Sequence, residues 1–179
     1  MTESSVDPST AIFLDTETTG SGPRDAVIEL GIVTAGGEAL VDSLVAPLAP
    51  VTSGARRVHG ISEEDLEGAP SFSDVADRVE TAFSEADSIW AFAASYDKRM
   101  LLQTAMQADR PRISQRLREG PWKDLQPQAT DALQDKEQVS LTDAARRLGV
   151  TIPTEGRHHR ALYDARLARR IWTSIRRPH

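Results

Sequence analysis

The chain contains no cysteine, which excludes disulfide bonds, thiolate zinc sites and thiol nucleophiles. This absence fits a reducing compartment, so we expect a cytoplasmic protein. No apolar stretch approaches the roughly 18 residues that a membrane-spanning helix needs. Residues 1–10 are polar and lack a basic region, so they do not resemble a signal peptide and are expected to form a short disordered tail. Residues 11–175 are expected to form a single domain.

Positive charge is in deficit, because the 179-residue chain has a formal net charge of −6. This balance argues against a broad basic surface that would bind long duplex DNA. The basic residues are unevenly distributed: residues 140–179 carry 9 arginines and only 3 acids, and a second basic run extends from Lys98 to Arg118. Each run is either a set of solvated helix faces or the lining of an approach for a polyanion.

Two carboxylates stand one residue apart at the end of the first apolar run, in the segment AIFLDTETTG (residues 11–20). Successive side chains of a β-strand alternate between its faces, so Asp15 and Glu17 point to the same side. Like charges that close repel and raise each other's pKa unless a cation lies between them. Carboxylate oxygens suit a hard divalent cation such as Mg²⁺ or Mn²⁺. The pair therefore predicts a phosphate-cleaving metalloenzyme.

The pattern along the chain predicts strands first and then helices mixed with strands. Strands are expected over residues 11–16, 26–34, 39–45 and 88–92, with a tight hairpin turn at Gly36-Gly37. Helices are expected over residues 73–84, 97–108, 141–148 and 158–175, and a short one after Ser62. The rest of residues 47–70 should be loop, and the proline- and glutamine-rich residues 109–139 are left unassigned.

A further carboxylate lies on the apolar stripe of the expected last helix. Asp164 is three residues after Ala161 of that stripe, so it should face the core. A buried carboxylate is costly unless it is paired or bound to a cation. Arg160 is one candidate partner at helical spacing, and a metal ion is the other. His158 and His159 stand directly upstream, and a neutral histidine there can take a proton from water unless both are merely exposed loop residues.

Asp97 follows the short apolar strand expected over residues 88–92. By itself it is typical of a helix N-cap. If that strand ends beside the first strand, however, Asp97 approaches Asp15 and Glu17 as a further carboxylate. The residues alone leave both interpretations open.

These motifs resemble those of the DEDD 3′–5′ exonucleases in their histidine form, DEDDh. Residues 15–20 (DTETTG) are similar to the first family motif and residues 95–97 (SYD) to the second. Residues 159–165 (HRALYDA) resemble the third motif, with His159 five residues before Asp164. The resemblance covers residues 11–173 in the expected order, and it includes the segments 27–31 (VIELG) and 58–62 (VHGIS).

The resemblance implies a ribonuclease H-like α/β fold, with a mixed five-stranded sheet, antiparallel first strands and helices on both faces. It also implies two divalent cations, Mg²⁺ or Mn²⁺, held by four carboxylates: Asp15, Glu17, Asp97 and Asp164. Asp15 would lie between the two ions, and His159 would deprotonate the attacking water. The backbone around Thr18 and Thr19, together with His59, would hold the terminal nucleotide.

The implied activity is release of nucleoside 5′-monophosphates from the 3′ end of single-stranded nucleic acid, with DNA favoured over RNA. The protein would be free-standing or the proofreading partner of a DNA polymerase. One alternative is an exoribonuclease acting on short RNA. Another is a weakly active nucleic-acid-binding or polymerase-docking module, because Ala93 stands where many family members carry asparagine. The complete set of four carboxylates and a histidine argues against this last alternative.

Overall fold

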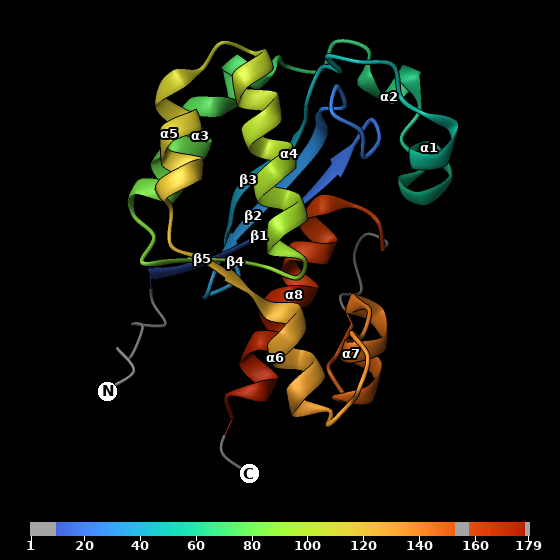
Figure 1. Ribbon diagram of the computed structural model, residues 1–179, viewed down its shortest axis with the longest axis vertical. Helices are drawn as coiled ribbons and strands as arrows, with labels where there is room; N and C mark the ends of the chain where they lie inside the picture. The colour runs from blue at the N-terminus through green and yellow to red at the C-terminus, as the bar shows by residue number, and fades with distance from the viewer. Residues whose placement is uncertain (1–9, 153–157, 178–179) are drawn as a thin grey trace.

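The computed structural model describes residues 10–152 and 158–177 (Figure 1). The expected N-terminal tail therefore lies outside the described residues, except for Thr10, whose hydroxyl donates a hydrogen bond to Asp87. None of the helices in the described ranges combines the length and apolar character that crossing a membrane requires.

Five strands form one mixed sheet in the order β3-β2-β1-β4-β5. The first three are antiparallel neighbours: β1 (Ala11–Thr18), β2 (Val27–Thr34) and β3 (Ala39–Leu44). The other two run parallel to β1: β4 (Ser88–Ala91) and β5 (Trp122–Asp124). The apolar start of β1 is buried because helices cover both faces of this central strand. The predicted mixed five-stranded sheet is confirmed.

Alternate side chains of β1 enter two different hydrophobic cores. Ile12 and Leu14 belong to the core that is completed by α3 (Phe72–Ser84), α4 (Ala94–Gln107) and α5 (Pro111–Glu119). Phe13 belongs to the other core, which is completed by α6 (Leu125–Ala132), α7 (Leu141–Arg147) and α8 (Ala161–Ile175). Figure 1 shows the first group of helices above and the second group below, with β4 and β5 between them. The carboxyl end of β1 is thereby flanked by α4 and α8, both of which contact this strand.

Two helices begin at residues other than those expected. α4 begins at Ala94, so Asp97 lies in its first turn and the N-cap interpretation of Asp97 is wrong. α8 begins at Ala161 rather than at His158, which leaves both histidines in the loop before the helix. The apolar periodicity of side chains shows that a helix exists, but it does not show where the backbone hydrogen bonds start.

The segments rich in proline and glycine contain helices that their composition conceals. α1 (Ser53–His59) interrupts the expected loop, with Thr52 as its N-cap and Gly60 as its left-handed C-cap. α2 (Glu63–Leu66) begins after Ser62, as expected. The unassigned region before α7 contains α5, β5 and α6. α5 starts at a proline, which is compatible with the first turn of a helix.

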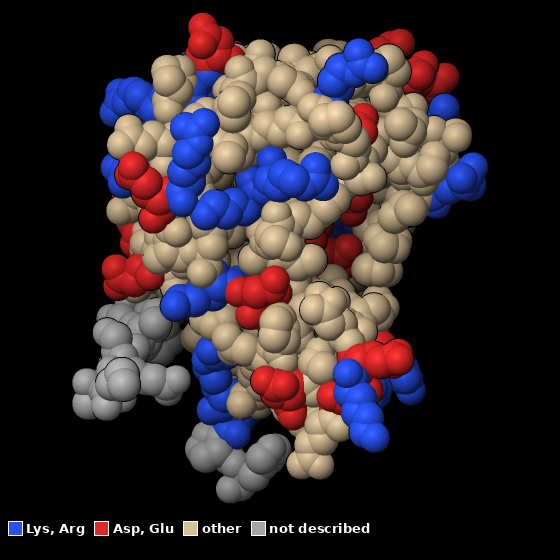
Figure 2. All heavy atoms as spheres, viewed as in Figure 1, with Lys and Arg blue, Asp and Glu red and all other residues tan. Residues whose placement is uncertain are grey.

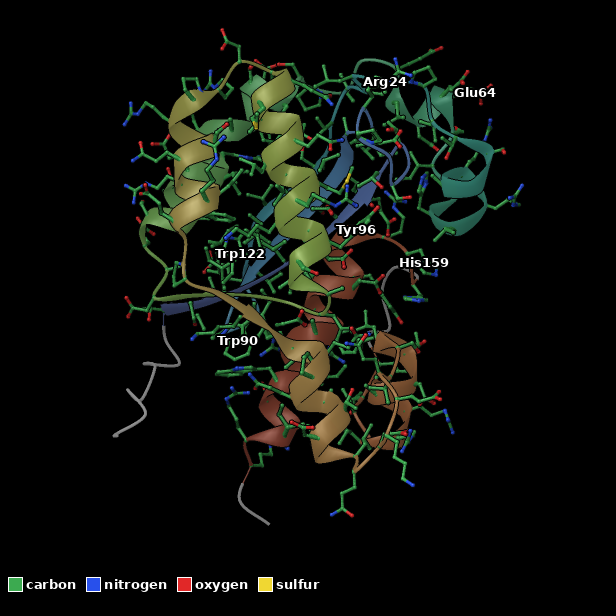
Figure 3. The ribbon with its side chains drawn as sticks, in the orientation of Figure 1. Arg24, Glu64, Trp90, Tyr96, Trp122 and His159 are labelled. Carbon is green, nitrogen blue, oxygen red and sulfur yellow. The ribbon has the colours of Figure 1, made fainter. Side chains whose placement is uncertain are left out.

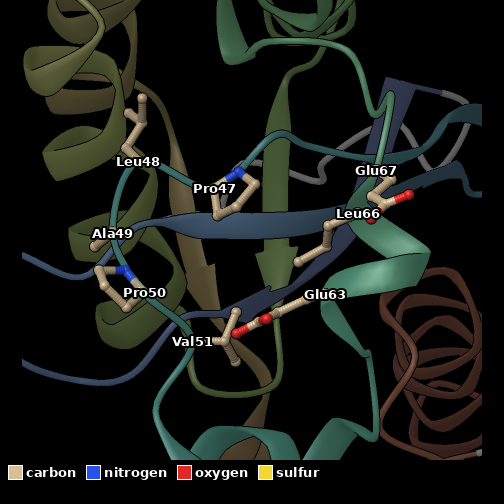
Figure 4. Close-up of a pocket in the computed structure, with 8 residues that line it drawn as sticks. All are labelled: Pro47, Leu48, Ala49, Pro50, Val51, Glu63, Leu66 and Glu67. Atoms are coloured by element: carbon tan, nitrogen blue, oxygen red, sulfur yellow. The ribbon is translucent and has the colours of Figure 1, made fainter.

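A hollow of about 400 Å³ lies beside α2, and it is lined by residues 47–51, Glu63, Leu66 and Glu67 (Figure 4). Glu63 extends from α2 toward Val51 in this view. None of the carboxylates predicted to bind metal lines this hollow. It is therefore separate from the predicted metal site.

Candidate active site

β1 brings the first two predicted carboxylates to one face of the sheet. Across the antiparallel pair, Asp15 faces Gly31 and Glu17 faces Glu29. A Cβ atom on Gly31 would collide with the backbone of Ala161, so glycine allows the start of α8 to pack directly on the sheet. The first turn of α8 thereby comes to lie beside the two carboxylates.

α8 supplies the third predicted carboxylate from this first turn. One oxygen each of Asp15, Glu17 and Asp164 lies within 4.8 Å of the other two. Glu17 and Asp164 are only 8% and 3% exposed, so water solvates their charges poorly. The suggested partner of Asp164, Arg160, is bound to Glu29 instead. An Arg160–Asp164 pair therefore does not account for the buried carboxylate.

The fourth predicted carboxylate, Asp97, approaches from α4, because β4 runs beside β1 and ends shortly before that helix. Asp97 is 3% exposed, and its Oδ1 accepts a hydrogen bond of 2.8 Å from the Thr16 hydroxyl. Thr16 points to the face of β1 opposite that of Asp15. Among the described residues, Asp97 lies outside the group of oxygens within 4.8 Å, yet its charge raises the pKa of Asp15.

Burial raises the pKa of all four carboxylates, and repulsion within the cluster raises it further for Asp15 and Glu17. The pKa of Asp15 is well above its usual value because of burial, and then because of the negative charges of the neighbouring acids. The pKa of Glu17 rises from 4.5 to about 8, chiefly through burial and then through the charge of Asp164. Burial also raises the pKa of Asp97 to about 7 and that of Asp164 above its usual value. The cluster is therefore stabilised by bound protons or by a cation.

We expect the protein to lose stability in EDTA as the pH rises from about 5 to about 8. The folded chain holds the Glu17 proton with a pKa of about 8 against 4.5 for the ordinary side chain. The stabilisation of the folded state by this proton is complete below pH 4.5 and is lost as the pH rises through about 8. Thermal unfolding in EDTA at several pH values measures it, and Mg²⁺ should restore stability at pH 8. A Glu17→Gln variant with an unchanged pH slope would contradict the assignment.

The donor set fits a hard divalent cation. Carboxylate oxygens are the ligands that Mg²⁺ and Mn²⁺ prefer, and oxygens of Asp15, Glu17 and Asp164 converge here. The guanidinium of Arg160 lowers the pKa of Glu17 only through its charge, because its N–H groups donate to Glu29. The three convergent carboxylates are the residues that could hold an ion at this point.

His158 and His159 lie directly before α8 with their ring centroids 3.7 Å apart. Nδ1 of His158 is 2.7 Å from Asp164 Oδ1, whereas His159 donates its backbone N–H to Asp164 Oδ2. His159 has a φ of 62°, a left-handed conformation that non-glycine residues seldom adopt. Burial and the neighbouring His158 lower the pKa of His159, which favours its neutral form. The structure thus brings both histidines to Asp164, although sequence spacing singled out His159.

An ion pair between half-buried Arg160 and buried Glu29 anchors the start of α8 to β2. Arg160 donates two hydrogen bonds of 2.9 and 2.6 Å to Glu29 Oε1, and the backbone N–H of Ala161 donates one of 2.9 Å to Glu29 Oε2. Glu29 is 3% exposed. Sequence reasoning gave Glu29 no role of its own. The available signal was an acidic residue within an otherwise apolar strand.

Two of the predicted nucleotide-binding residues line a hollow of about 300 Å³ that adjoins the carboxylates. Thr18 and His59 line it, and so does Glu17. Tyr96 is a further lining residue, and its hydroxyl lies 2.8 Å from that of Thr18. Figure 3 shows Tyr96 on α4 and His159 close by before α8. The hollow therefore opens beside the acidic cluster. Tyr96 was not among the predicted site residues, although it directly precedes Asp97.

Thr19 occupies a different place from Thr18. It is fully buried, and its hydroxyl donates to Asp25 Oδ1 and accepts from the backbone N–H of Ala26. The backbone N–H of Thr19 also donates to the Ala26 carbonyl. The side chain of Thr19 thus closes the turn between β1 and β2 and does not line the hollow.

The sequence is similar to those of known exonucleases and of a DNA polymerase. The family model described as Exonuclease (RNase_T) matches residues 12–171. An uncharacterised exonuclease, CP81 of Escherichia phage 186, is 30% identical over 169 residues, which cover 87% of this chain and 82% of that protein. A PolC-type DNA polymerase III of Thermotoga maritima is 30% identical over 177 residues, 95% of this chain. This chain spans only 12% of that polymerase.

The fold is also shared with a solved structure described as exonuclease X in complex with 5′ overhanging duplex DNA. The two chains are 22% identical, and they superpose with a TM-score of 0.71 over 92% of this chain and 90% of the other. This likeness confirms the predicted ribonuclease H-like architecture.

Proposed function

The chain belongs to the exonuclease family whose model matches residues 12–171, and from that premise we propose that it removes nucleotides one at a time from the 3′ end of single-stranded nucleic acid. DNA is the proposed substrate in preference to RNA, and the products are nucleoside 5′-monophosphates. Residues 11–175 form the proposed exonuclease domain. The main support is the convergence of three carboxylates, two of them buried, beside a nucleotide-sized hollow.

Four carboxylates are proposed to hold two divalent cations, Mg²⁺ or Mn²⁺: Asp15, Glu17, Asp97 and Asp164. When bound, such ions stabilise the charge on the attacking and leaving oxygens of an in-line phosphoryl displacement. The raised pKa values of Asp15 and Glu17 support this assignment, because a cation would offset both the burial and the repulsion that raise them. The charges of the other three acids all raise the pKa of Asp15, which supports Asp15 as a residue that would hold a cation.

His159 is proposed to take a proton from the attacking water. Its pKa is lowered, so the ring is neutral near pH 7 and can accept that proton. Its backbone N–H is fixed by Asp164, which holds the residue at the edge of the acidic cluster. His158 is proposed to orient Asp164 through its Nδ1 contact.

The terminal nucleotide is proposed to occupy the hollow lined by Thr18 and His59, with the backbone around Thr18 and Thr19 as further contacts. This hollow suits one nucleotide at a chain end better than it suits a duplex. A net charge of −6 agrees with an enzyme that engages only a short stretch of polyanion. The match to part of a PolC-type polymerase supports a DNA polymerase as a possible partner.

A weakly active nucleic-acid-binding or polymerase-docking module is the second candidate. One observation favours it: Ala93, at the N-cap of α4, makes no side-chain hydrogen bond to the helix that carries Asp97. Asn at this position can cap a helix, and alanine cannot. An Ala93→Asn variant with higher activity than the unmodified protein would support this candidate.

A linear single strand with a free 3′ hydroxyl is expected to be degraded in Mg²⁺ or Mn²⁺, whereas a circular single strand of the same sequence should resist cleavage. The hollow is proposed to hold a chain end, and a circle has none. Chromatography of the products should show mononucleotides with 5′ phosphates, and a 3′ phosphate on the substrate should slow their release.

Matched DNA and RNA strands in the same assay decide between a deoxyribonuclease and an exoribonuclease, because only RNA carries a 2′ hydroxyl that a site can select. EDTA provides the negative control. Rapid nicking of the circle would identify an endonuclease and overturn the proposed substrate polarity.

A further inference from the structure

Three basic side chains lead away from the nucleotide-sized hollow: Lys98, Arg99 and Arg118, called here the basic strip. Arg99 stands at the rim of the hollow. Its guanidinium carbon lies 5.2 Å from the centre of the Tyr96 ring, and its Nη1 donates a hydrogen bond of 3.4 Å to the Ser21 carbonyl. Tyr96 and Ser21 both line the hollow, so the strip begins where a bound nucleotide would end.

Lys98 continues the strip from the start of α4 to the end of α5. Its Nζ donates a hydrogen bond of 2.9 Å to the Arg118 carbonyl. Nη2 of Arg118 in turn lies 3.5 Å from Met106 Sδ, and Met106 is 58% exposed. These contacts are to uncharged groups, which position the basic side chains without neutralising them.

The basic strip takes part in no salt bridge with the acids that the structure describes. Within the part of the chain that the structure describes, no carboxylate forms an ion pair within 4.0 Å with any of its three side chains. Two other arginines of α5 and its N-cap differ in this respect: Arg110 pairs with Asp77 at 2.7 Å, and Arg112 with Glu80 at 3.4 Å. The strip therefore keeps free positive charge in a protein that is acidic overall.

The basic strip and the acidic cluster share one face of the molecule. Figure 2 shows Lys and Arg side chains gathered over α4 and α5, and a recess beside them with acidic atoms at its bottom. In the same orientation, Tyr96 is labelled on the side of α4 that borders this recess (Figure 3). A strand could pass from the recess over α4 without leaving this face.

We propose that the basic strip binds the phosphates on the 5′ side of the terminal nucleotide. The proposal rests on the exonuclease function proposed above and specifies how the rest of the strand is held. Arg99 contacts the first phosphate upstream of the scissile phosphate, and Lys98 and Arg118 contact those farther upstream. Because acidic surface elsewhere repels a polyanion, three uncompensated cations direct the strand across α4 and α5. Neutralised phosphates release counterions, so the contacts should weaken steeply with salt.

The triple variant Lys98→Gln/Arg99→Gln/Arg118→Gln tests the strip by steady-state kinetics on a single strand of about 20 nucleotides and on a dinucleotide. For the long strand we expect KM to rise about tenfold or more, and the slope of log KM against log salt to fall by about 2, as three phosphate contacts require. kcat should stay within about twofold. KM for a dinucleotide without a 5′ phosphate should also stay within about twofold, because its only phosphate is the scissile one and none reaches the basic strip.

A matched control removes the same charge from α8 and the residues just after it. Arg166, Arg170 and Arg177 form no ion pair within 4.0 Å with a described carboxylate, and the variant Arg166→Gln/Arg170→Gln/Arg177→Gln should change KM for the long strand far less. Equal effects of the two triple variants would overturn the strip in favour of a general charge effect. An equal loss on the dinucleotide would overturn it in favour of damage to the active site. If the unmodified protein degrades neither substrate, the proposed exonuclease function itself fails.

Discussion

Replacing Asp15 with asparagine is expected to lower kcat by about 10⁴-fold or more. A carboxylate oxygen of Asp15 lies within 4.8 Å of one oxygen each of Glu17 and Asp164, and the charge of Asp97 also raises the pKa of Asp15. An amide would weaken the proposed hold on both cations, whose stabilisation of the reacting oxygens is worth several kcal/mol. Release of mononucleotides from a labelled single strand measures the loss.

The same variant should be at least as stable as the unmodified protein in EDTA, because it removes one of the repelling charges. Asp42→Asn is the matched control, since Asp42 is an exposed aspartate on β3. It should leave both kcat and thermal stability nearly unchanged. Full activity of Asp15→Asn, or full activity of the unmodified protein in excess EDTA, would contradict a metal site at the end of β1.

Replacing His159 with alanine is expected to lower kcat by about 10²–10⁴-fold, the usual effect of removing a general base. The lowered pKa of His159 keeps the ring neutral at working pH, so it is ready to accept a proton. Metal affinity should change little, because the contact between His159 and Asp164 is made by the backbone N–H. The pH–rate profile of His159→Ala should also lack the fall in kcat at low pH that protonation of His159 causes.

His158→Ala provides the comparison, because the two rings are neighbours, tilted by 32°, and the side chain of His158 lies 2.7 Å from Asp164. We expect this variant to lose less than about tenfold in kcat and to shift the metal concentration that gives half-maximal activity. Equal losses in the two variants, or a larger loss for His158→Ala, would contradict the proton-accepting role proposed for His159. Measuring kcat and metal dependence for both variants separates these outcomes.

The positions of three carboxylates followed from local patterns in the sequence. Alternation along β1 places Asp15 and Glu17 on one face, and the apolar stripe of α8 places Asp164 toward the core. The structure bears out both placements. These inferences succeeded because each depends on periodicity within one element and on the high cost of burying an unpaired charge.

What the sequence did not reveal depends on contacts between distant residues. The partner of Arg160 is Glu29 on another strand, not Asp164 one helical turn away. Local spacing cannot identify such a partner, because it is determined by which strand the helix packs against. Likewise, the glycine and proline content of residues 47–70 hid α1, whose ends are defined by Thr52 and Gly60 as caps.

The anchor between Glu29 and Arg160 joins two parts of the chain that are synthesised at different times. The two residues are 131 positions apart, and the start of α8 joins β2 through them. Contacts between such distant positions close late, because a long loop must lose its freedom before they form. A nascent chain that has not yet presented α8 lacks Asp164 and both histidines. Such a nascent chain therefore carries only part of the acidic cluster while it is still close to its own messenger RNA.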